Sequence, residues 1–404
     1  MLNDSQDIIL SVVIPTRNRI DCAKYCVLSA LEATSKSEIV ILDSSDHDQL
    51  ISILENVVGK AEDFKRIQYY KTSKSLNVVE NFEAGIEYCK GTYITYLGDD
   101  DLIGPNVESI CRCAEINGVD SITSYGLKFG VAYYWPGVKS KYFGDAYDSK
   151  VFVWSMSGEH HLIDVNKEMD LTKSNIGFGL AKLPRIYHGL VSRDLVNKVI
   201  SKHGKLFGGV SPDIYSAVLL SLNCEKPMFI DYPVCVPGVS AKSEAGSGAA
   251  RTDRQGFYDS AYLSRFKDLE WDELVPMFFS PYNVWGFSIA EAYKNSGNEM
   301  EPDFYCRLYV RCFLYCFSYR KETLFAYRRF SRKYGKVNSA LMMIKSLFSE
   351  ITHFSLRIVS KLSSPKAGGK AKRYCNINNS IEAYNLLSEI SKKDLLKSIK
   401  ELGC

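Results

Sequence analysis

The sequence lacks the features that define several common classes of protein. It contains twelve cysteines but no CxxC pair, and the closest two are Cys111 and Cys113. This spacing argues against a zinc site and against a disulfide framework, so we expect free thiols in a reducing, cytosolic setting. No uninterrupted apolar run approaches the roughly 20 residues that a membrane-spanning helix requires.

The amino-terminal residues also lack the pattern of a secretory signal. Asp4 and Asp7 precede a short apolar run, Ile8–Ile14, which ends at Pro15. Low-complexity tracts are absent, and the composition is that of a globular protein, with 46% hydrophobic and 24% charged residues. A chain of 404 residues is long enough for a catalytic domain of ordinary size and an additional region.

The net charge of +3 conceals an uneven distribution. Residues 305–373 contain 16 lysines and arginines but only two acids, Glu322 and Glu350, so this segment carries a charge of about +14. The rest of the chain is therefore near −11. Such a split is typical of a protein in which only one part meets an electrostatic partner.

Strand and helix patterns alternate through the first hundred residues. Apolar runs of strand length are separated by helical stretches, which predicts βαβ units and a mostly parallel sheet. The expected strands are Ile8–Ile14, Glu38–Leu42, Arg66–Tyr70 and Thr92–Leu97, and the expected helices are Asp21–Ala33, Gln49–Val58 and Val78–Cys89. Residues 105–255 show a mixed pattern with more loops, and from about residue 257 the pattern is helical and aromatic.

Polar segments follow three of these strands at the point where each strand ends. They are Pro15–Thr16, Asp43–Ser44 and Asp99–Asp101. Ligands of parallel α/β sheets bind beyond the carboxyl ends of the strands. We therefore expect the three segments to converge on one crevice.

The three consecutive aspartates, Asp99–Asp101, are the most informative of these segments. Adjacent carboxylates repel one another, and beside a hydrophobic strand they need a cation. Because only oxygen ligands are near, without histidine or cysteine, the pattern favours Mg²⁺ or Mn²⁺ over zinc. The alternative is a solvated acidic turn that caps the next helix, but the preceding strand and the two other polar strand ends favour the metal site.

Four stretches together resemble the family 2 glycosyltransferases with the GT-A fold: "SVVIPTRNR", "ILDSSD", "NVVENFEAGIEYCKGTYITYLGDDDLIGP" and "GGVSPDIY". The resemblance covers roughly residues 8–250. It implies an α/β fold of the GT-A type, with a Rossmann-like, mixed but mostly parallel sheet flanked by helices, here followed by a C-terminal helical region. It also implies an enzyme that transfers a sugar from a nucleotide diphosphate donor and inverts the anomeric centre.

The resemblance assigns roles to the polar segments. The acid cluster corresponds to the family's DXD-type element, which implies that Asp100 and Asp101 hold Mn²⁺ or Mg²⁺ on the diphosphate. The family motif begins with an aspartate where this chain has Gly98, so this register points to Asp100 first. The residues implied in binding the donor nucleotide are Pro15, Thr16, Arg17, Asn18, Asp43, Ser44, Asn77 and Asp99. The resemblance implies UDP as the donor nucleotide. The family often has a second acid that contacts uracil where this chain has Ser44, and for this reason dTDP and GDP are kept as alternatives.

Sugar transfer needs two kinds of help. Negative charge grows on the leaving diphosphate as the glycosidic bond breaks, and a bound cation stabilises it. The acceptor hydroxyl must lose a proton, which a carboxylate within hydrogen-bond reach can accept. We expect Asp213 to be this base, because its context agrees with the family's acceptor-side acid. Since Ser211, Pro212 and Asp213 also form the pattern of a helix start, a purely structural role for Asp213 is the alternative.

Further candidates are weaker. His188 could contact donor or acceptor, and a structural histidine is the alternative. A later loop could close over the diphosphate through Lys242 or Ser243, and an ordinary surface loop is the alternative. Arg17 and Arg19 could reach phosphates, with solvated loop arginines as the alternative.

Residues 305–362 combine positive charge with aromatic and aliphatic side chains. Between residues 340 and 362 apolar residues recur every three or four positions, which predicts an amphipathic helix. A basic amphipathic segment with aromatic residues is typical of binding to an anionic membrane surface. Packing of the helix on the catalytic region or on another subunit is the alternative.

We therefore expect three regions along the chain. Residues 1–255 would form the GT-A nucleotide-sugar-binding and catalytic domain, 256–365 the basic aromatic helical region, and 366–404 a linker with a short helical tail. The family most often serves bacterial surface polysaccharide synthesis, which implies a glycan or lipid-linked acceptor. The expected location is cytoplasmic and peripheral on the inner face of the cytoplasmic membrane.

Two other classes of function fit parts of the sequence. A nucleotidyltransferase with a similar sheet would need a glycine-rich loop with lysine after the first strand, but "IPTRNR" contains no glycine. A nucleic-acid-binding protein would use the basic segment, but it leaves the acid cluster unexplained, because carboxylates repel phosphates. We therefore expect no nucleic acid among the partners.

Overall fold

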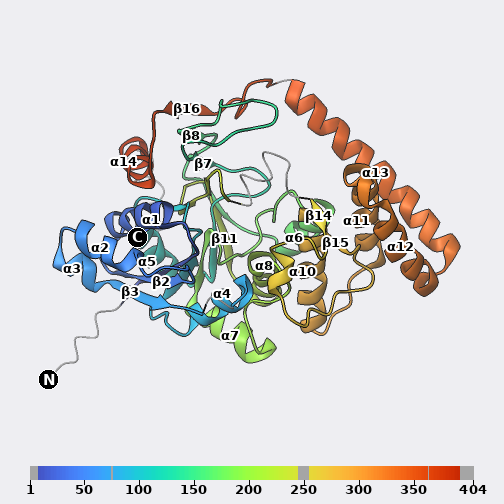
Figure 1. Ribbon diagram of the computed structural model, residues 1–404, viewed down its shortest axis with the longest axis horizontal. Coiled ribbons are helices and arrows are strands. Elements are labelled where there is room, and N and C mark those ends of the chain that lie inside the picture. Colours follow the sequence, from blue (N-terminus) through green and yellow to red (C-terminus); the bar gives the residue numbers. More distant parts are fainter. Residues whose placement is uncertain (1–7, 74–75, 244–253, 363, 392–404) are drawn as a thin grey trace.

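The computed structural model describes residues 8–73, 76–243, 254–362 and 364–391. Its centre is an eight-stranded sheet with the strand order β3-β2-β1-β4-β10-β6-β11-β9 (Figure 1). The strands of this sheet are β1 (Leu10–Thr16), β2 (Ser37–Asp43), β3 (Ile67–Lys71), β4 (Tyr93–Tyr96), β6 (Ser121–Thr123), β9 (His160–Leu162), β10 (Gly189–Ser192) and β11 (Pro227–Ile230). The helices up to this point of the chain are α1 (Ile20–Ala33), α2 (Leu50–Val57), α3 (Ala61–Lys65), α4 (Val78–Ile86), α5 (Val107–Ile116), α6 (Val165–Ser174), α7 (Arg193–His203) and α8 (Pro212–Asn223).

The sheet is mixed but mostly parallel in its first half. Strands β3, β2, β1 and β4 run parallel to one another, whereas β10 runs antiparallel to both β4 and β6. The α/β class and the mostly parallel sheet expected from the sequence are confirmed. All four strands and all three helices expected in the first hundred residues are present, with ends shifted by up to three residues; the short helix α3 was not expected.

Side chains of the strands alternate between two hydrophobic cores, one on each face of the sheet. In β1, Val12 and Ile14 belong to the core beneath α1, α2 and α5, whereas Val13 belongs to the core shared with α4, α8 and the later helices. Strands buried on both faces read as continuous apolar runs, which is why "SVVIP" and "IVIL" were readable as strands. The second core runs from Val13 to Phe330 and so includes residues on both sides of position 255. The expected domain boundaries stay a prediction.

A smaller sheet covers the carboxyl end of the large one. It has the order β13-β7-β8-β16, from β13 (Gly238–Val239), β7 (Val131–Tyr134), β8 (Lys150–Val153) and β16 (Lys372–Cys375). Two short pairs join β5 (Leu102–Ile103) to β12 (Cys235–Val236) and β14 (Gln255–Gly256) to β15 (Phe278–Phe279). The region expected to be a linker with a helical tail thus contains a strand, since β16 pairs antiparallel with β8, and α14 (Ser380–Ser391) then packs on α1 (Figure 1).

The remaining helices form a layer beside α6 and α8. They are α10 (Pro281–Asn295), α11 (Pro302–Tyr315), α12 (Arg320–Tyr334) and α13 (Lys336–Leu362), with short 3-10 turns at Leu263–Arg265 and Phe317–Tyr319. The 27-residue helix α13 lies along the outside of α11 and α12 (Figure 1). No helix among the described residues is long and apolar enough to cross a bilayer.

Helix α13 packs on α11 with its polar side. Glu350 is 4% exposed, and its carboxylate accepts hydrogen bonds from Arg311, Arg357 and the hydroxyl of Tyr315 at 2.6–2.9 Å. Arg311, which is 1% exposed, also donates to the carbonyl of Ile176. A set of buried charges that is fully hydrogen-bonded fixes one packing arrangement, because any slip leaves a charge unpaired.

The cysteines depart from the expectation at one position. Among the described residues ten cysteines are free thiols, of which seven are buried, two are half-buried and one is exposed, but Cys113 in α5 is disulfide-bonded. The expectation of free thiols is therefore confirmed for the ten and wrong for Cys113.

We predict that Glu350→Ala lowers the free energy of unfolding by about 3–5 kcal/mol, because it leaves the buried Arg311 guanidinium without its counter-charge. Urea unfolding followed by circular dichroism measures this change. The matched control is Lys345→Ala on the same helix, which removes the exposed ion pair with Asp303 and should cost about 0–1 kcal/mol. Equal effects of the two substitutions would contradict the role assigned to Glu350.

Candidate active site

A cleft of about 610 Å³ opens at the carboxyl ends of β1 and β4. Its walls come from the loops after these strands, from the first turns of α4 and α8, and from β13. Eleven of the residues expected from the sequence line it: Pro15, Thr16, Arg17, Ser44, Asn77, Asp99, Asp100, Asp101, His188, Asp213 and Ser243. The structure therefore brings together segments that are up to 230 residues apart, as the positions of the strand ends predicted.

Three expected residues do not line this cleft. The buried carboxylate of Asp43 accepts hydrogen bonds from the hydroxyl of Tyr69 at 2.7 Å and from the backbone of Ser45 at 2.8 Å, so it shapes the turn after β2 instead. Asn18 and Lys242 line a neighbouring cavity of about 260 Å³. For these three residues, direct contact with a ligand in the main cleft is not supported.

Asp101 is the most constrained of the three aspartates. It is 1% exposed, and its Oδ1 accepts from the backbone N–H of Gly238 at 2.6 Å. Its Oδ2 accepts from the backbone N–H of Gly98 at 2.6 Å, from Nε2 of His188 at 2.5 Å and from the Tyr187 hydroxyl at 3.3 Å. These partners, which we call the Asp101 hydrogen-bond cluster, join the β4 loop to β13 and to the segment before β10.

The cluster also explains why Gly98 stands where the family motif begins with an aspartate. A Cβ added at Gly98 would lie 2.6 Å from the Tyr187 hydroxyl and 2.9 Å from Oδ2 of Asp101. A side chain at this position would therefore have to displace the Tyr187 hydroxyl and the Asp101 carboxylate, which would disturb the Asp101 hydrogen-bond cluster.

Asp99 and Asp100 share one counter-charge, the guanidinium of Arg19. Nη1 of Arg19 lies 2.6 Å from Oδ1 of Asp99, and Nη2 lies 2.7 Å from Oδ2 of Asp100. Thr16 donates to Oδ2 of Asp99 at 2.8 Å, and the backbone N–H of Ser240 donates to Oδ2 of Asp100 at 3.0 Å. Oδ1 of Asp99 is buried without an aligned hydrogen bond, so its contact with Arg19 is purely ionic.

Burial and mutual repulsion make this pair of carboxylates costly to ionise. Burial raises the pKa of Asp99 to about 7, with Arg19 opposing the shift and Asp100 adding to it. Burial and Asp101 likewise raise the pKa of Asp100, again against Arg19. Burial by itself would lower the pKa of Arg19, but the carboxylates of Asp99 and Asp100 outweigh it and raise that pKa. The arrangement thus holds strained negative charge at the cleft.

Asp213 also lines the cleft, from the first turn of α8. Pro212 is the first residue of the helix, as the sequence predicted, but the Ser211 hydroxyl caps no backbone N–H and donates to Oδ1 of Asp213 at 2.6 Å instead. Asp213 is only partly buried and faces the cleft. Its carboxylate is thus available to a ligand, whereas that of Asp101 is not.

The cleft also exposes the start of α4. Asn77 forms a capping box there, since its side chain accepts from the backbone N–H of Glu80 and the Glu80 carboxylate accepts from the backbone N–H of Asn77. Asn77 is therefore the N-cap of α4. Asn77 nevertheless lines the cleft, so it can serve both the helix and a ligand.

Several lining residues were not singled out from the sequence. Trp285 of α10 and Arg265 come from the C-terminal half, and Arg265 donates to the carbonyl of Leu76 beside the start of α4. Tyr187 and Phe129 add aromatic surface. An isolated tryptophan or arginine in a helical region carries no local signal for such a role, although Tyr187 could have been suspected as the neighbour of His188.

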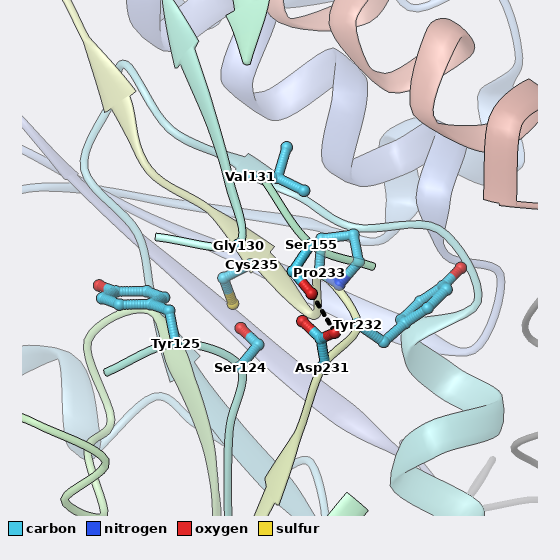
Figure 2. A pocket seen from close by; sticks show the side chains of 9 residues that line it. All are labelled: Ser124, Tyr125, Gly130, Val131, Ser155, Asp231, Tyr232, Pro233 and Cys235. Carbon is cyan, nitrogen blue, oxygen red and sulfur yellow. Dashed lines mark hydrogen bonds between the residues drawn. The ribbon is translucent and has the colours of Figure 1, made fainter. Parts of the chain in front are cut away.

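A second, much smaller cavity lies apart from this cleft, between β7, β8 and the segment after β11 (Figure 2). Its volume of about 10 Å³ is close to that of a single water. The hydroxyl of Ser155 donates to Asp231 at its edge, and the buried hydroxyl of Ser124 has no partner among the described residues. This cavity is therefore a structural void and not a substrate site.

The donors in the main cleft fit a divalent cation that is completed by a ligand. Among the described residues, no group of three or more His, Cys, Asp or Glu side chains is arranged to hold a metal by itself. Two carboxylates, however, are the usual protein share of a Mg²⁺ or Mn²⁺ site whose other ligands are waters and substrate phosphates. Asp99, whose Oδ1 accepts no hydrogen bond, and Asp100 beside it supply such a pair, which Arg19 now neutralises in part.

Comparison with known proteins identifies the amino-terminal part of this architecture. Residues 11–129 match the model of the family described as "Glycosyl transferase family 2". An uncharacterised glycosyltransferase of Haemophilus influenzae is 27% identical over 96 residues, which are 24% of this chain and 37% of that protein. An uncharacterised glycosyltransferase of Rickettsia conorii is 38% identical over 104 residues, 25% of this chain and 16% of that protein. The chain thus spans well under half the length of these relatives.

Solved structures with a similar course of the chain have low sequence identity. Staphylococcus aureus TarS 1–349 in complex with UDP-GlcNAc is 11% identical, with a TM-score of 0.45, over 84% of this chain and 79% of that one. A mannosyltransferase of Pyrobaculum calidifontis in complex with GDP-Man and Mn²⁺ is 12% identical, with a TM-score of 0.40, over 96% and 87%. At these values we infer nothing about the ligands of this chain from either structure.

The family match confirms what the motifs indicated. The residues that match the glycosyl transferase family 2 model, 11–129, include β1, β4 and all three aspartates of the cleft. The residues beyond position 129 supply Asp213, His188 and β13 to the same site.

We predict opposite effects on stability for two neighbouring substitutions. Asp99→Asn should raise the free energy of unfolding at pH 8 by about 1–3 kcal/mol, because the native state then no longer ionises a carboxyl whose pKa is raised. This gain should vanish as the pH falls through 7 toward 4, where the native carboxyl is protonated. Asp101→Asn should lower stability by about 2–4 kcal/mol, because an amide cannot accept from both Gly98 and His188 while also accepting from Gly238.

Thermal and urea unfolding between pH 4 and pH 8 measure both effects. The exposed Asp145→Asn serves as the control and should change stability by less than about 0.5 kcal/mol. Destabilisation by Asp99→Asn at pH 8 would refute the view that this carboxylate is strained.

Proposed function

We propose that this chain is a metal-dependent, inverting glycosyltransferase that moves a sugar from a nucleotide diphosphate sugar to a hydroxyl group of an acceptor. The observation that carries the proposal is the convergence of two kinds of carboxylate on one cleft. Asp99 and Asp100 are buried and strained, whereas Asp213 is partly exposed at the start of α8. This division matches the two needs of sugar transfer, a cation on the leaving group and a base at the acceptor.

The donor nucleotide would bind at the β1 and β2 side of the cleft. Pro15, Thr16, Arg17 and Ser44 line that side, and the capped N-terminus of α4 at Asn77 offers a positive helix end. UDP stays the first expectation for the nucleotide. Because Ser44 stands in place of an acid that would contact uracil, dTDP and GDP are the alternatives. Asn18 and Asp43 would act indirectly, by holding the turns on which these residues stand.

Asp99 and Asp100 would hold the divalent cation, and bound Mn²⁺ or Mg²⁺ would stabilise the negative charge on the departing diphosphate. Asp101, first expected to be a metal ligand, suits a different role. Both of its oxygens accept hydrogen bonds from the protein, so it would fix the loop that presents the other two. His188 would support Asp101 in this role, and Ser243 lies where it can reach the phosphates.

Asp213 would accept the proton of the attacking hydroxyl. It lies in the first turn of α8, where the hydroxyl of Ser211 donates to Oδ1 and orients the carboxylate. The other oxygen is then the one that can face an acceptor. Inversion follows if the acceptor attacks from the Asp213 side while the diphosphate leaves toward Asp99 and Asp100.

The acceptor proposed is a glycan or a lipid-linked sugar, as in bacterial surface polysaccharide synthesis, and helix α13 supports contact with a membrane. Glu350 on its buried side faces α11, and many of its exposed side chains are apolar. The apolar side chains that are at least 40% exposed on it are Val337, Leu341, Ile344, Leu347, Phe348, Ile351, Phe354, Leu356, Ile358 and Val359. Val310, Phe313 and Leu314 of α11 continue this face into an apolar cavity of about 230 Å³.

Charge favours an anionic bilayer over a second copy of the chain as the occupant of this face. Helix α12, which packs against α13, is rich in arginine and lysine, and residues 305–373 carry about +14. A second copy would bring the same positive charge to the interface, whereas anionic lipid headgroups would neutralise it. We therefore propose that the protein binds peripherally to the inner face of the cytoplasmic membrane through α13.

We predict that substitutions of Asp100 and Asp213 have different effects, the first on nucleotide binding and the second on turnover. Asp100→Ala should abolish the Mn²⁺-dependent rise in melting temperature that UDP, dTDP or GDP produces. Asp213→Asn should keep that rise but lower Mn²⁺-dependent hydrolysis or transfer of the nucleotide sugar by a factor of about 10²–10⁴, because only the proton acceptor is lost.

The matched control is Asp194→Asn, which changes an exposed acid in the first turn of α7 outside the cleft. Its melting temperature shift and its turnover should both equal those of the unchanged protein. Near-normal turnover by Asp213→Asn would show that another group accepts the proton, and an absent shift with all three nucleotides would refute the donor site.

We predict that replacing Ile344, Leu347, Ile351 and Phe354 together by glutamine lowers binding to phosphatidylglycerol vesicles at least tenfold, because it removes the apolar face while leaving the buried polar side intact. Co-sedimentation measures the binding, and phosphatidylcholine vesicles should bind the unchanged protein more weakly.

The control replaces Ile116, Leu162 and Tyr258, three exposed apolar residues on other elements, by glutamine and should leave binding unchanged. The membrane proposal fails if the unchanged protein does not co-sediment with anionic vesicles. If ultracentrifugation then shows that the unchanged protein is a dimer and the quadruple variant a monomer, a second copy occupies this face.

A further inference from the structure

We propose that Arg19 is the built-in counter-cation of the acid cluster and that a divalent ion replaces it only when a nucleotide diphosphate is present. This inference rests on the proposed function, because it concerns the same metal site. It adds a residue that competes with the metal, and therefore an order in which metal and nucleotide are bound.

The competition follows from which oxygens Arg19 uses. Its guanidinium contacts Oδ1 of Asp99 at 2.6 Å and Oδ2 of Asp100 at 2.7 Å. Asp99 and Asp100 would hold the cation, and Arg19 occupies one oxygen of each carboxylate. A guanidinium and a metal ion cannot both lie within contact distance of the same pair of oxygens, so one must leave before the other binds.

The backbone of Arg19 is fixed, but its side chain has room to move. The carbonyl of Arg19 accepts from the N–H of Ala23 in the first turn of α1, which holds the residue at the helix start. The side chain is 22% exposed and lines both the main cleft and the neighbouring cavity of about 260 Å³. It already contacts the hydroxyl of Ser240, which belongs to the lining of that second cavity. A displaced guanidinium can therefore turn aside without any change in the fold.

Charge decides when the exchange happens. One guanidinium leaves the two carboxylates with a net charge of −1, whereas a divalent ion neutralises both. In the absence of a diphosphate, the metal must displace the guanidinium of Arg19. Because Arg19 is part of the same chain, its effective concentration at the two carboxylates is high. A bound diphosphate brings negative charge of its own, which favours the ion together with the released Arg19 over Arg19 alone. Nucleotide binding should thus raise the affinity for the metal, and the reverse holds by linkage.

The test is the binding of Mn²⁺ itself, measured by electron paramagnetic resonance or calorimetry with and without UDP or GDP. The unchanged protein should bind Mn²⁺ weakly alone and at least tenfold more tightly with nucleotide. Arg19→Met should bind Mn²⁺ alone at least tenfold more tightly than the unchanged protein, and nucleotide should then add less. Mn²⁺ should also raise the melting temperature of Arg19→Met more than that of the unchanged protein.

Two further variants keep the test decisive. Lys36→Met removes an exposed cation elsewhere in the same domain and should leave Mn²⁺ binding unchanged. Arg19→Gln, which keeps N–H donors for the carboxylates but removes the charge, replaces Arg19→Met if that variant does not fold. If Mn²⁺ binds the unchanged protein with nucleotide but neither Arg19 variant binds it more tightly, the Arg19 proposal is overturned and the proposed function stands. If Mn²⁺ binds no variant under any condition, the metal site of the proposed function fails as well.

Discussion

The buried carboxylate of Asp101 is the interaction on which the site depends. It receives hydrogen bonds from Gly98 in the β4 loop, from Gly238 in β13 and from His188 before β10, at distances of 2.5–2.6 Å. Each of these segments belongs to a different part of the chain, so one side chain sets their relative positions. A charged group with 1% exposure is tolerable only when it is fully hydrogen-bonded, and these bonds meet that condition. The carboxyl end of the sheet is therefore rigid where the cleft opens.

That rigidity is what allows two further carboxylates to remain close together. Asp99 and Asp100 repel one another and are buried, and an unconstrained loop would turn them toward solvent. The Asp101 hydrogen-bond cluster, the bond from Trp135 to the carbonyl of Asp100 and the guanidinium of Arg19 prevent this. The stability lost by holding these charges is recovered elsewhere in the fold, as is usual for functional sites. A divalent cation bound at this position would relieve the repulsion between the two carboxylates.

Much of this could be predicted from the sequence because it is encoded locally. Apolar runs that end in polar residues gave β1, β2 and β4 and placed their ends together, and "SPD" gave the start of α8 with Asp213 in its first turn. What could not be predicted depends on contacts between distant segments. Nothing in three identical residues shows that Asp101 is held by the protein while Asp99 and Asp100 face Arg19. Likewise, Asp43 accepts a hydrogen bond from Tyr69 on the neighbouring strand β3 and does not line the cleft. Residues Lys372–Cys375 form strand β16 by pairing with the distant strand β8.

The orientation of helix α13 also depends on contacts between distant segments and could not be predicted from the sequence. A period of three to four residues predicts an amphipathic helix, but it does not say which side faces the protein. Here the buried side is polar, because Glu350 pairs with Arg311 and Arg311 in turn donates to the carbonyls of Ser174 and Ile176 after α6. Such directional bonds allow one orientation of the helix, whereas an apolar seam would tolerate several. The outward apolar face is consequently held at a set position relative to the part of the chain that forms the cleft. If this face docks on a surface as proposed, the packing of α13 on α11 would set the position of that surface relative to the carboxylates of the cleft.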